Sequence, residues 1–403
     1  MRMEMFLPGL PLLIDRPAMN IIEPTKQQLD DLVNPFLAHA NVGFAIGYAS
    51  PQFQETGKFY FKNSSPLLNQ NNQEVPLGAE TYFEIASISK VFTATLFQLF
   101  VQNGTIANNE IPLGDYFPRG KIGLGEQFLD IPLLALSNYT SGLPQDNDSA
   151  PDEPAYLPMP YTVLNMFSYL ANTDLTVNTP GTAYTYSNLG FAILAQTASV
   201  AAVERIGEFG ELLRSEILGP LAMDATKLFY QVGFNRLPLG YSSHGPKGVP
   251  NPPGMAEFPA YYGAGGLLST PRDMMVWLKF NMGIIQNSTL SSLLPTLQAP
   301  STTVTPWANS QLGIGWFLTT IPTSGDSYTI VWKDGGLGGF SSYICFLQSA
   351  NPGQTPSQAG FFILTNADGD AVYTIESELM SIMTGNSELA ASMRLLSTRK
   401  STK

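Results

Sequence analysis

FEIASISKVFTATL, residues 83–96, places a serine and a lysine three positions apart at the start of an apolar run of helical length. At that spacing the side chains of Ser87 and Lys90 lie on one face of a helix. A hydroxyl is a weak nucleophile, but an amine held among apolar groups loses its proton more easily and can activate it. The free N–H groups and positive dipole end of the helix would also stabilise negative charge that develops at Ser87. The pattern therefore predicts a serine nucleophile with a lysine partner.

The setting of this pair matters, because a serine and a lysine at this spacing also occur by chance. Ser397 and Lys400 form a second such pair in a polar, basic tail that no apolar helix follows. We interpret that copy as meaningless and expect chemistry only at Ser87.

A second candidate element is Tyr-Ser-Asn at residues 186–188, between a Pro-Gly turn and an apolar run that predicts a helix. It would bring the phenol of Tyr186 and the amide of Asn188 to one place. The phenol could relay protons if cationic neighbours depress its pKa, and the amide could orient a lysine or hold a substrate carbonyl. The alternative is structural, a half-buried tyrosine followed by an asparagine N-cap.

A third element is the segment WKDGGLGGFSSYICF, residues 332–346, which predicts two strands joined by a glycine-rich bend. Glycines at a strand edge let a substrate backbone approach closely. Lys333 could then hold a carboxylate or stabilise a deprotonated Tyr186, and the N–H of Gly336 could donate to an oxyanion. The alternative is a plain hairpin with a solvated lysine.

The order of the three elements resembles that of the penicillin-recognising serine hydrolases. S-x-x-K opens an apolar helix, Y-x-N follows, and K-x-G comes last, as in class C β-lactamases and the related DD-peptidases and serine esterases. Other segments also match this family in kind, namely residues 82–85, 136–144, 274–278, 312–316 and 362–366. The resemblance extends over about residues 25–385.

The resemblance implies a role for each matching residue. It assigns the chemistry to four side chains, with Ser87 as acylated nucleophile, Lys90 as its amine partner, Tyr186 as general base and proton relay, and Lys333 completing the electrostatic cluster. It assigns substrate contacts to Asn188, Gln145, Asp334 and Gly335, and the oxyanion hole to the backbone N–H groups of Ser87 and Gly336. No metal or cofactor is expected.

Two departures from the family pattern leave the substrate open. Asp334 stands where β-lactamases usually carry a hydroxyl that helps to bind the substrate carboxylate, and an acidic side chain would repel that carboxylate. This favours esters or uncharged amides. Conversely, many esterase-type relatives carry histidine or tryptophan where this chain has Lys333. The expected substrate is therefore a β-lactam, a D-amino-acid peptide or a carboxylic ester.

Two further activities remain as alternatives to hydrolysis. The same acyl-enzyme could pass its acyl group to an acceptor other than water, as in an acyltransferase. The chain could also be a non-catalytic ligand-binding relative, although an inactive relative typically loses one of the four residues that are intact here.

The other residues argue against competing chemistries. Only two histidines occur, both outside any G-x-S-x-G pentad, so a Ser-His-Asp triad is not expected. The single cysteine, Cys345, and the lack of paired histidines argue against zinc, and Cys345 is expected in the core. A net charge of −12 argues against nucleic acid and anionic membranes as partners. A small-molecule amide or ester is thus the expected partner, with the oligomeric state left open.

The distribution of apolar patterns predicts the fold. A helix is expected over 25–39, strands over 42–48, 57–62, 312–320, 328–333, 341–348 and 360–366, and a last helix over 370–384. Strands at both ends with helices between them predict an α/β (α+β) fold, in which helices flank an antiparallel sheet built from both termini. The sheet domain would comprise residues 1–104 and 305–403, and residues 105–304 would form a mainly helical insert, with the catalytic residues at the junction.

The sequence leaves the cellular compartment open. No run approaches 18 apolar residues, so no membrane-spanning segment is expected. The first fourteen residues contain two prolines and Glu4 and no A-x-A-like site, which argues against a signal peptide. The protein is expected in the cytoplasm or, if its N-terminus is atypical, in the periplasm or outside the cell.

Overall fold

The computed structural model describes residues 19–117, 124–147, 159–172, 177–241, 250–251, 257–323, 327–389 and 393–394. The first fourteen residues and the second serine–lysine pair, Ser397 and Lys400, lie outside this part. Within it, no helix combines the length and the apolar character needed to cross a membrane.

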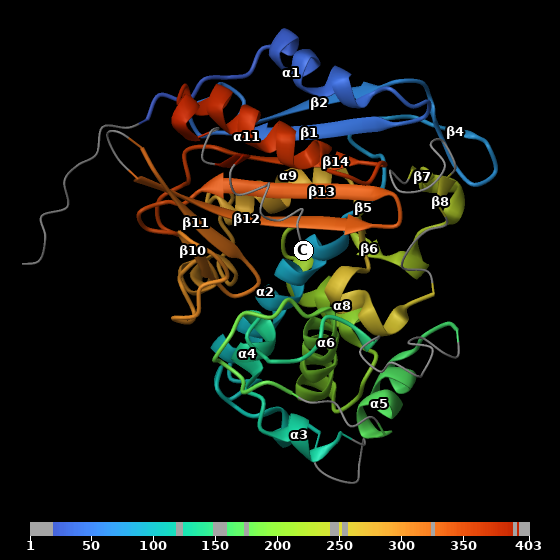
Figure 1. The fold of residues 1–403 in the computed structure, drawn as a ribbon, viewed down its shortest axis with the longest axis vertical. Helices are drawn as coiled ribbons and strands as arrows, with labels where there is room; N and C mark the ends of the chain where they lie inside the picture. Colours follow the sequence, from blue (N-terminus) through green and yellow to red (C-terminus); the bar gives the residue numbers. More distant parts are fainter. Residues whose placement is uncertain are drawn as a thin grey trace, which may run out of the picture.

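A seven-stranded antiparallel sheet lies at the centre of one half of the molecule (Figure 1). Its strands, in spatial order, are β10 (Ser310–Leu312), β11 (Phe317–Pro322), β12 (Ser327–Leu337), β13 (Phe340–Leu347), β14 (Gly360–Thr365), β1 (Gly43–Ala49) and β2 (Gly57–Asn63). Strand β1 pairs with β2 on one side and with β14 on the other. The prediction of an antiparallel sheet built from both ends of the chain is confirmed.

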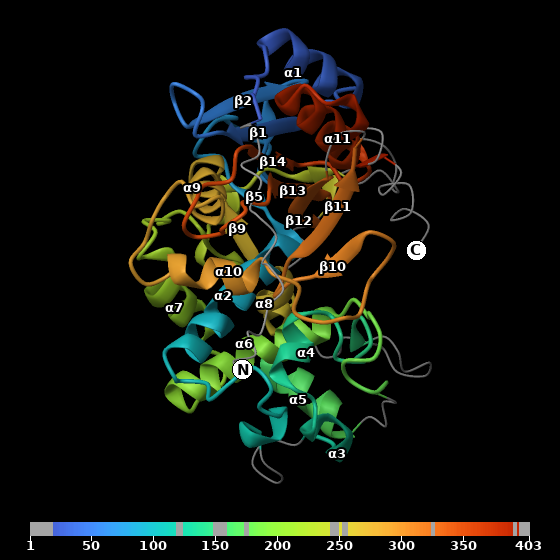
Figure 2. The ribbon, with the colours of Figure 1, turned by 90° about the vertical axis from the view of Figure 1, so that its left-hand side faces the viewer.

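Helices cover both faces of this sheet (Figures 1 and 2). α1 (Lys26–Val33) and α11 (Ala371–Thr384) pack together on one face, and α9 (Pro271–Asn281) packs on the other, against β1 and β14. Because both faces are covered, every residue of β1, β13 and β14 is buried. Helix α9 belongs to the stretch expected to form the insert, yet it packs on the sheet. The division of the chain at residues 104 and 305 stays a prediction.

The other half of the molecule is mainly helical (Figure 2). At its centre α2 (Ser89–Gln102) contacts α6 (Asn188–Val203) and α8 (Tyr262–Gly265). Helix α2 is buried from Ser89 to Phe100, which fits a helix that is apolar on all sides. Its C-cap is Asn103. The remaining helices are α3 (Glu126–Leu129), α4 (Leu133–Ser137), α5 (Val163–Asn172), α7 (Phe209–Leu213) and α10 (Leu294–Leu297).

Two elements differ from the sequence-based prediction. The helix expected over 25–39 stops at Val33 and gives way to a 3₁₀ turn, because Pro35 lacks an N–H and its ring clashes with the preceding turn. The single strand expected over 312–320 is two strands, β10 and β11. Gly315 between them has φ of +78°, a conformation that breaks a strand and suits glycine.

Short strands complete the structure. β5 (Phe83–Glu84), β9 (Leu267–Ser269) and β6 (Lys227–Leu228) form a three-stranded sheet, while β3 (Leu67–Leu68) pairs with β4 (Glu74–Val75) and β7 (Gly240–Tyr241) with β8 (Pro250–Asn251). Strand β5 matters most here, because it leads directly into the turn that carries Ser87.

Candidate active site

Ser87 lies in a 3₁₀ turn, Ala86–Ile88, between strand β5 and helix α2. The approach to the turn is held in place, because β5 pairs with β9 and the N–H of Ile85 donates to the carbonyl of Leu267 at 3.1 Å. Ala86 has φ of +46°, a left-handed conformation that costs a non-glycine residue about 1–3 kcal/mol. This strained turn holds Ser87 just ahead of the helix that the sequence predicts.

Lys90 is completely buried and reaches Ser87 from the first turn of α2. Its Nζ lies 2.9 Å from Ser87 Oγ, 2.6 Å from Asn188 Oδ1 and 2.7 Å from the main-chain oxygen of Ala264. Burial, reinforced by the positive charge of Lys333, lowers the pKa of Lys90 well below its ordinary value of 10.5. The surroundings therefore favour the neutral amine, the form that can act as a base.

Tyr186 also contacts Ser87. Its Oη donates a hydrogen bond to Ser87 Oγ at 2.8 Å. The Nζ atoms of Lys90 and Lys333 lie 4.9 Å and 5.4 Å from the centre of its ring. Nevertheless burial, followed by the negative charge of Asp334, raises the pKa of Tyr186 above 10.0. The condition considered from the sequence, a phenol pKa depressed by cations, is therefore not met, and the surroundings of Tyr186 favour its protonated form.

Asn188 is the first residue of α6 and connects two other side chains. Its Oδ1 accepts from Lys90, and its Nδ2 donates to Asp146 Oδ1 at 2.9 Å. The N-cap of α6 is Ser187, whose Oγ accepts the N–H of Gly190 at 2.9 Å. The alternative that Asn188 serves as an N-cap is therefore wrong, and its amide orients the lysine.

Lys333 is buried and forms an ion pair with its neighbour Asp334. Its Nζ lies 2.8 Å from Asp334 Oδ1 and 2.7 Å from the main-chain oxygen of the same residue. Tyr373 of helix α11 donates to Asp334 Oδ2 at 2.6 Å, and the Asp334 charge together with burial raises the pKa of Tyr373. The alternative of a solvated lysine is wrong, and the charge of Lys333 is balanced inside the site.

Strand β12 packs closely against the turn that carries Ser87 through Gly335. A Cβ atom on this residue would lie 2.5 Å from the main-chain oxygen of Ile85 and 3.0 Å from the nitrogen of Ser87, so no other residue fits. A Cβ atom on Gly336 would meet nothing within 4 Å, because this residue faces open space. Gly336 and Ser87 both line the same cavity.

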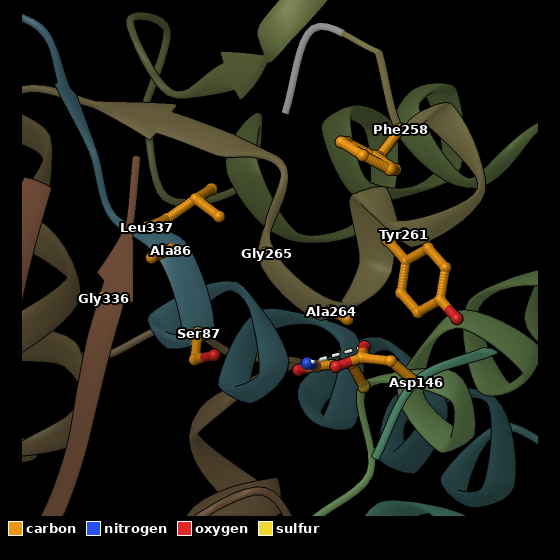
Figure 3. Close-up of a pocket in the computed structure, with 10 residues that line it drawn as sticks. Ala86, Ser87, Asp146, Phe258, Tyr261, Ala264, Gly265, Gly336 and Leu337 are labelled. Atoms are coloured by element: carbon orange, nitrogen blue, oxygen red, sulfur yellow. Dashed lines mark hydrogen bonds between the residues drawn. The ribbon is translucent and has the colours of Figure 1, made fainter. Parts of the chain in front are cut away.

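Two cavities meet at Ser87. The smaller, of about 220 Å³, has Phe258 and Tyr261 on the wall facing Ser87, with Asp146 and Ala264 along its floor (Figure 3). The larger, of about 780 Å³, opens on the side of Tyr186 and Asp334. Three residues line both cavities, namely Ser87, Asn188 and Gly336. A bond that reaches Ser87 therefore has room for one substituent in each cavity.

A sequence model of the family described as Beta-lactamase matches residues 54–378. The chain belongs to the beta-lactamase family. The D-alanyl-D-alanine-carboxypeptidase/endopeptidase AmpH of Escherichia coli K12 is 28% identical over 346 residues, which covers 83% of this chain and 85% of AmpH. A protein named Beta-lactamase from Pseudomonas fluorescens is 25% identical over 368 residues, or 81% of this chain and 91% of that protein.

Solved structures of the beta-lactamase family share the fold. A class C beta-lactamase superposes with a TM-score of 0.66 at 20% identity, covering 88% of this chain and 96% of that chain. The class C beta lactamase from Rhodobacter sphaeroides gives 0.65 at 19% identity, covering 87% and 98%. The predicted family and fold class are confirmed, and the chain is a beta-lactamase-like serine hydrolase.

Three contacts of this beta-lactamase family site were not predicted from the sequence. The carboxylate of Asp146 accepts a hydrogen bond from Asn188. Gln145, the residue before Asp146, is exposed on the wall of the larger cavity, and the main-chain carbonyl of Gln145 accepts the N–H of Asn188. The only feature of the sequence that pointed to Asp146 was its place next to Gln145. The carbonyl of Ala264 and the phenol of Tyr373 had no motif that could have indicated them. No group of three or more His, Cys, Asp or Glu side chains that could hold a metal ion occurs in the described residues.

Proposed function

We propose that the protein hydrolyses an amide or ester bond of a small molecule through an acyl-enzyme on Ser87. The observation that carries this is the arrangement of acceptors around Lys90. A neutral amine has two N–H donors and one lone pair. Asn188 Oδ1 and the Ala264 carbonyl, at 2.6 Å and 2.7 Å, can each take one N–H, so the lone pair is left for the hydroxyl of Ser87 at 2.9 Å.

In the first step Ser87 Oγ attacks the carbonyl carbon while its proton moves to Lys90 Nζ. The oxygen of the carbonyl becomes an oxyanion, for which the N–H groups of Ser87 and Gly336 are the proposed donors. The bond from the carbonyl carbon to the leaving nitrogen or oxygen then breaks as Tyr186 protonates that atom. The proton held by Lys90 restores the phenol, which leaves the acyl-enzyme with both residues neutral.

In the second step a water molecule attacks the acyl carbon and gives its proton to the same pair of residues. The bond to Ser87 Oγ breaks, and that oxygen recovers its proton. An acceptor alcohol or amine could take the place of water, which is the acyltransferase alternative. The contacts from Lys90 and Tyr186 to Ser87 Oγ, at 2.9 Å and 2.8 Å, support catalysis over a purely ligand-binding role.

The charges of the site support neutral substrates over carboxylated ones. Lys333 is the cation expected to hold a carboxylate, and it is already paired with Asp334 at 2.8 Å. A β-lactam or a peptide with a terminal carboxylate would have to compete with this ion pair. We therefore propose esters and uncharged amides as the better substrates, with the β-lactam and D-alanyl peptide classes named for relatives as comparison substrates.

The experiment is a mass spectrometric search for acyl-enzymes. The protein is incubated separately with a fluorophosphonate, an activated ester and a β-lactam, and the modified residue is mapped. We expect one adduct, on Ser87, and loss of ester turnover in Ser87→Ala. Labelling at another residue, or undiminished turnover in Ser87→Ala, would contradict the mechanism.

A further inference from the structure

The two cavities at Ser87 differ in which catalytic side chain they contain. Tyr186 lines the larger cavity. It is not among the described residues that line the smaller one. A general acid has to lie within hydrogen-bond reach of the atom that it protonates. If Tyr186 protonates the leaving group, as in the proposed function, that group occupies the larger cavity and the acyl group occupies the smaller.

Aromatic rings form the walls of the larger cavity. Six side chains contribute, namely Tyr184, Tyr186, Trp307, Phe317, Trp332 and Tyr373. The ring of Trp307 lies near three others of this set, with its centroid 5.3 Å from that of Phe317, 6.0 Å from that of Trp332 and 5.8 Å from that of Tyr184. Such walls favour a flat apolar ligand, because aromatic pairs gain stabilisation beyond the burial of their area.

The charge of the larger cavity disfavours anions. Asp334 is the single charged residue among the described residues that line it. Its two carboxylate oxygens accept hydrogen bonds from Lys333 and Tyr373, and its side chain is still 25% exposed. A carboxylate in this cavity would approach a like charge, and the nearby cation is already balanced.

We propose that the larger cavity is a leaving-group site for an uncharged, flat aromatic alcohol or amine, so that the preferred substrates are aryl esters or aryl amides of small acyl groups. This inference rests on the proposed acylation of Ser87. The volumes agree with it, since about 780 Å³ is available on the leaving-group side and about 220 Å³ on the acyl side.

The test compares esters that differ in one half only. Phenyl acetate, 2-naphthyl acetate and 6-carboxy-2-naphthyl acetate vary the leaving group, while 2-naphthyl acetate and 2-naphthyl hexanoate vary the acyl group. We expect the naphthyl acetate to exceed the phenyl acetate in kcat/KM by about tenfold, the scale of an added apolar contact. The carboxylated ester should lose most of that gain, and the hexanoate should react more slowly than the acetate.

Two variants assign the cavities independently. Trp307→Ala should reduce the naphthyl-to-phenyl ratio by at least about fivefold and leave the acetate-to-hexanoate ratio as it is. Phe258→Ala is the matched control on the wall of the smaller cavity. It should change the acetate-to-hexanoate ratio and leave the naphthyl-to-phenyl ratio as it is. If Trp307→Ala relaxed the acyl preference instead, the assignment of the two cavities would be overturned.

Two measurements separate this inference from the proposed function. Acetylation of Ser87 at equal rates by all three acetates would overturn the leaving-group site and leave the acyl-enzyme mechanism intact, whereas no acetyl group on Ser87 would overturn the mechanism itself. Should Trp307→Ala fail to fold, 2-naphthol and 6-carboxy-2-naphthol are tested as inhibitors of the unaltered enzyme. Competitive inhibition by the neutral naphthol alone supports the site, and equal inhibition by both, or by neither, contradicts it.

Discussion

Tyr373 Oη donates to Asp334 Oδ2 at 2.6 Å, so helix α11 touches strand β12, which runs beside Ser87. The carboxylate is held on its other side by Lys333 at 2.8 Å. Asp334 is therefore fixed by two donors from different elements, α11 and β12. This fixed acid marks the clearest departure of the site from the family pattern that the sequence resembles.

Replacing this acid should change substrate preference. Asp334→Thr removes a like charge near the substrate carboxylate and releases the ammonium of Lys333, so kcat/KM for a carboxylated β-lactam should rise by about five- to tenfold. A neutral short-chain ester should be comparatively unaffected. Tyr373→Phe is the matched control, because it removes one hydrogen bond and keeps the charge. If the preference between the two substrates stayed the same in Asp334→Thr, discrimination against carboxylates would have another source.

Lys90 and Tyr186 should behave as one proton-transfer unit. Both side chains contact Ser87 Oγ. When two residues act as one unit, replacing either one removes most of the rate, so replacing the second adds little further loss. Lys90→Ala alone and Lys90→Ala with Tyr186→Phe should therefore lower kcat by similar factors, as measured by turnover of an activated ester. Multiplicative losses in the double variant would show that the two residues act independently.

The pH profile should report the state of Lys90. As a base it works in the neutral form, so kcat/KM for a neutral ester should rise with pH through its lowered pKa, well below 10.5. The positive charge of Lys333 lowers this pKa and the negative charge of Asp334 raises it. Lys333→Met should thus move the rise to higher pH, and Asp334→Asn should move it to lower pH. Shifts in the same direction would rule out Lys90 as the titrating base.

Asp30 should stabilise the fold in a pH-dependent way. Hydrogen bonds from Lys26, Tyr60 and Lys62 hold its pKa below the ordinary 3.8 and connect α1 to β2. A lowered pKa in the folded state contributes stability above pH 3.8, and that contribution is lost as the pH falls toward the folded-state pKa.

The corresponding measurement is thermal unfolding of Asp30→Asn across a pH series. Its Tm should lie below that of the unaltered protein at pH 7, and the difference should shrink in acid. Asp31→Asn, at the exposed neighbouring position of the same helix, is the control and should change Tm less. A difference that grew in acid would contradict the assigned role of the Asp30 carboxylate.

The sequence predicted those parts of the structure that local patterns encode. The spacing of Ser87 and Lys90 predicted their contact, and the apolar runs on both sides of a glycine-rich bend predicted the hairpin of β12 and β13, whereas the place of Tyr186 beside them was implied by the family resemblance. It did not predict what depends on distant partners. The raised pKa of Tyr186 comes from burial and from Asp334. Besides Asn188, Lys90 contacts the main-chain oxygen of Ala264, which carries no sequence signal.

The place of β1 between β2 and β14 has a consequence for synthesis. During translation β1, residues 43–49, is made early, and its neighbour β14, residues 360–365, is made near the end. Lys333 and Gly336 are made shortly before β14. Contacts between such distant segments form late, because a long loop has to close first. We therefore expect the nascent chain to carry Ser87 through most of translation without its proposed partners on β12, and reactivity to appear only when the sheet closes.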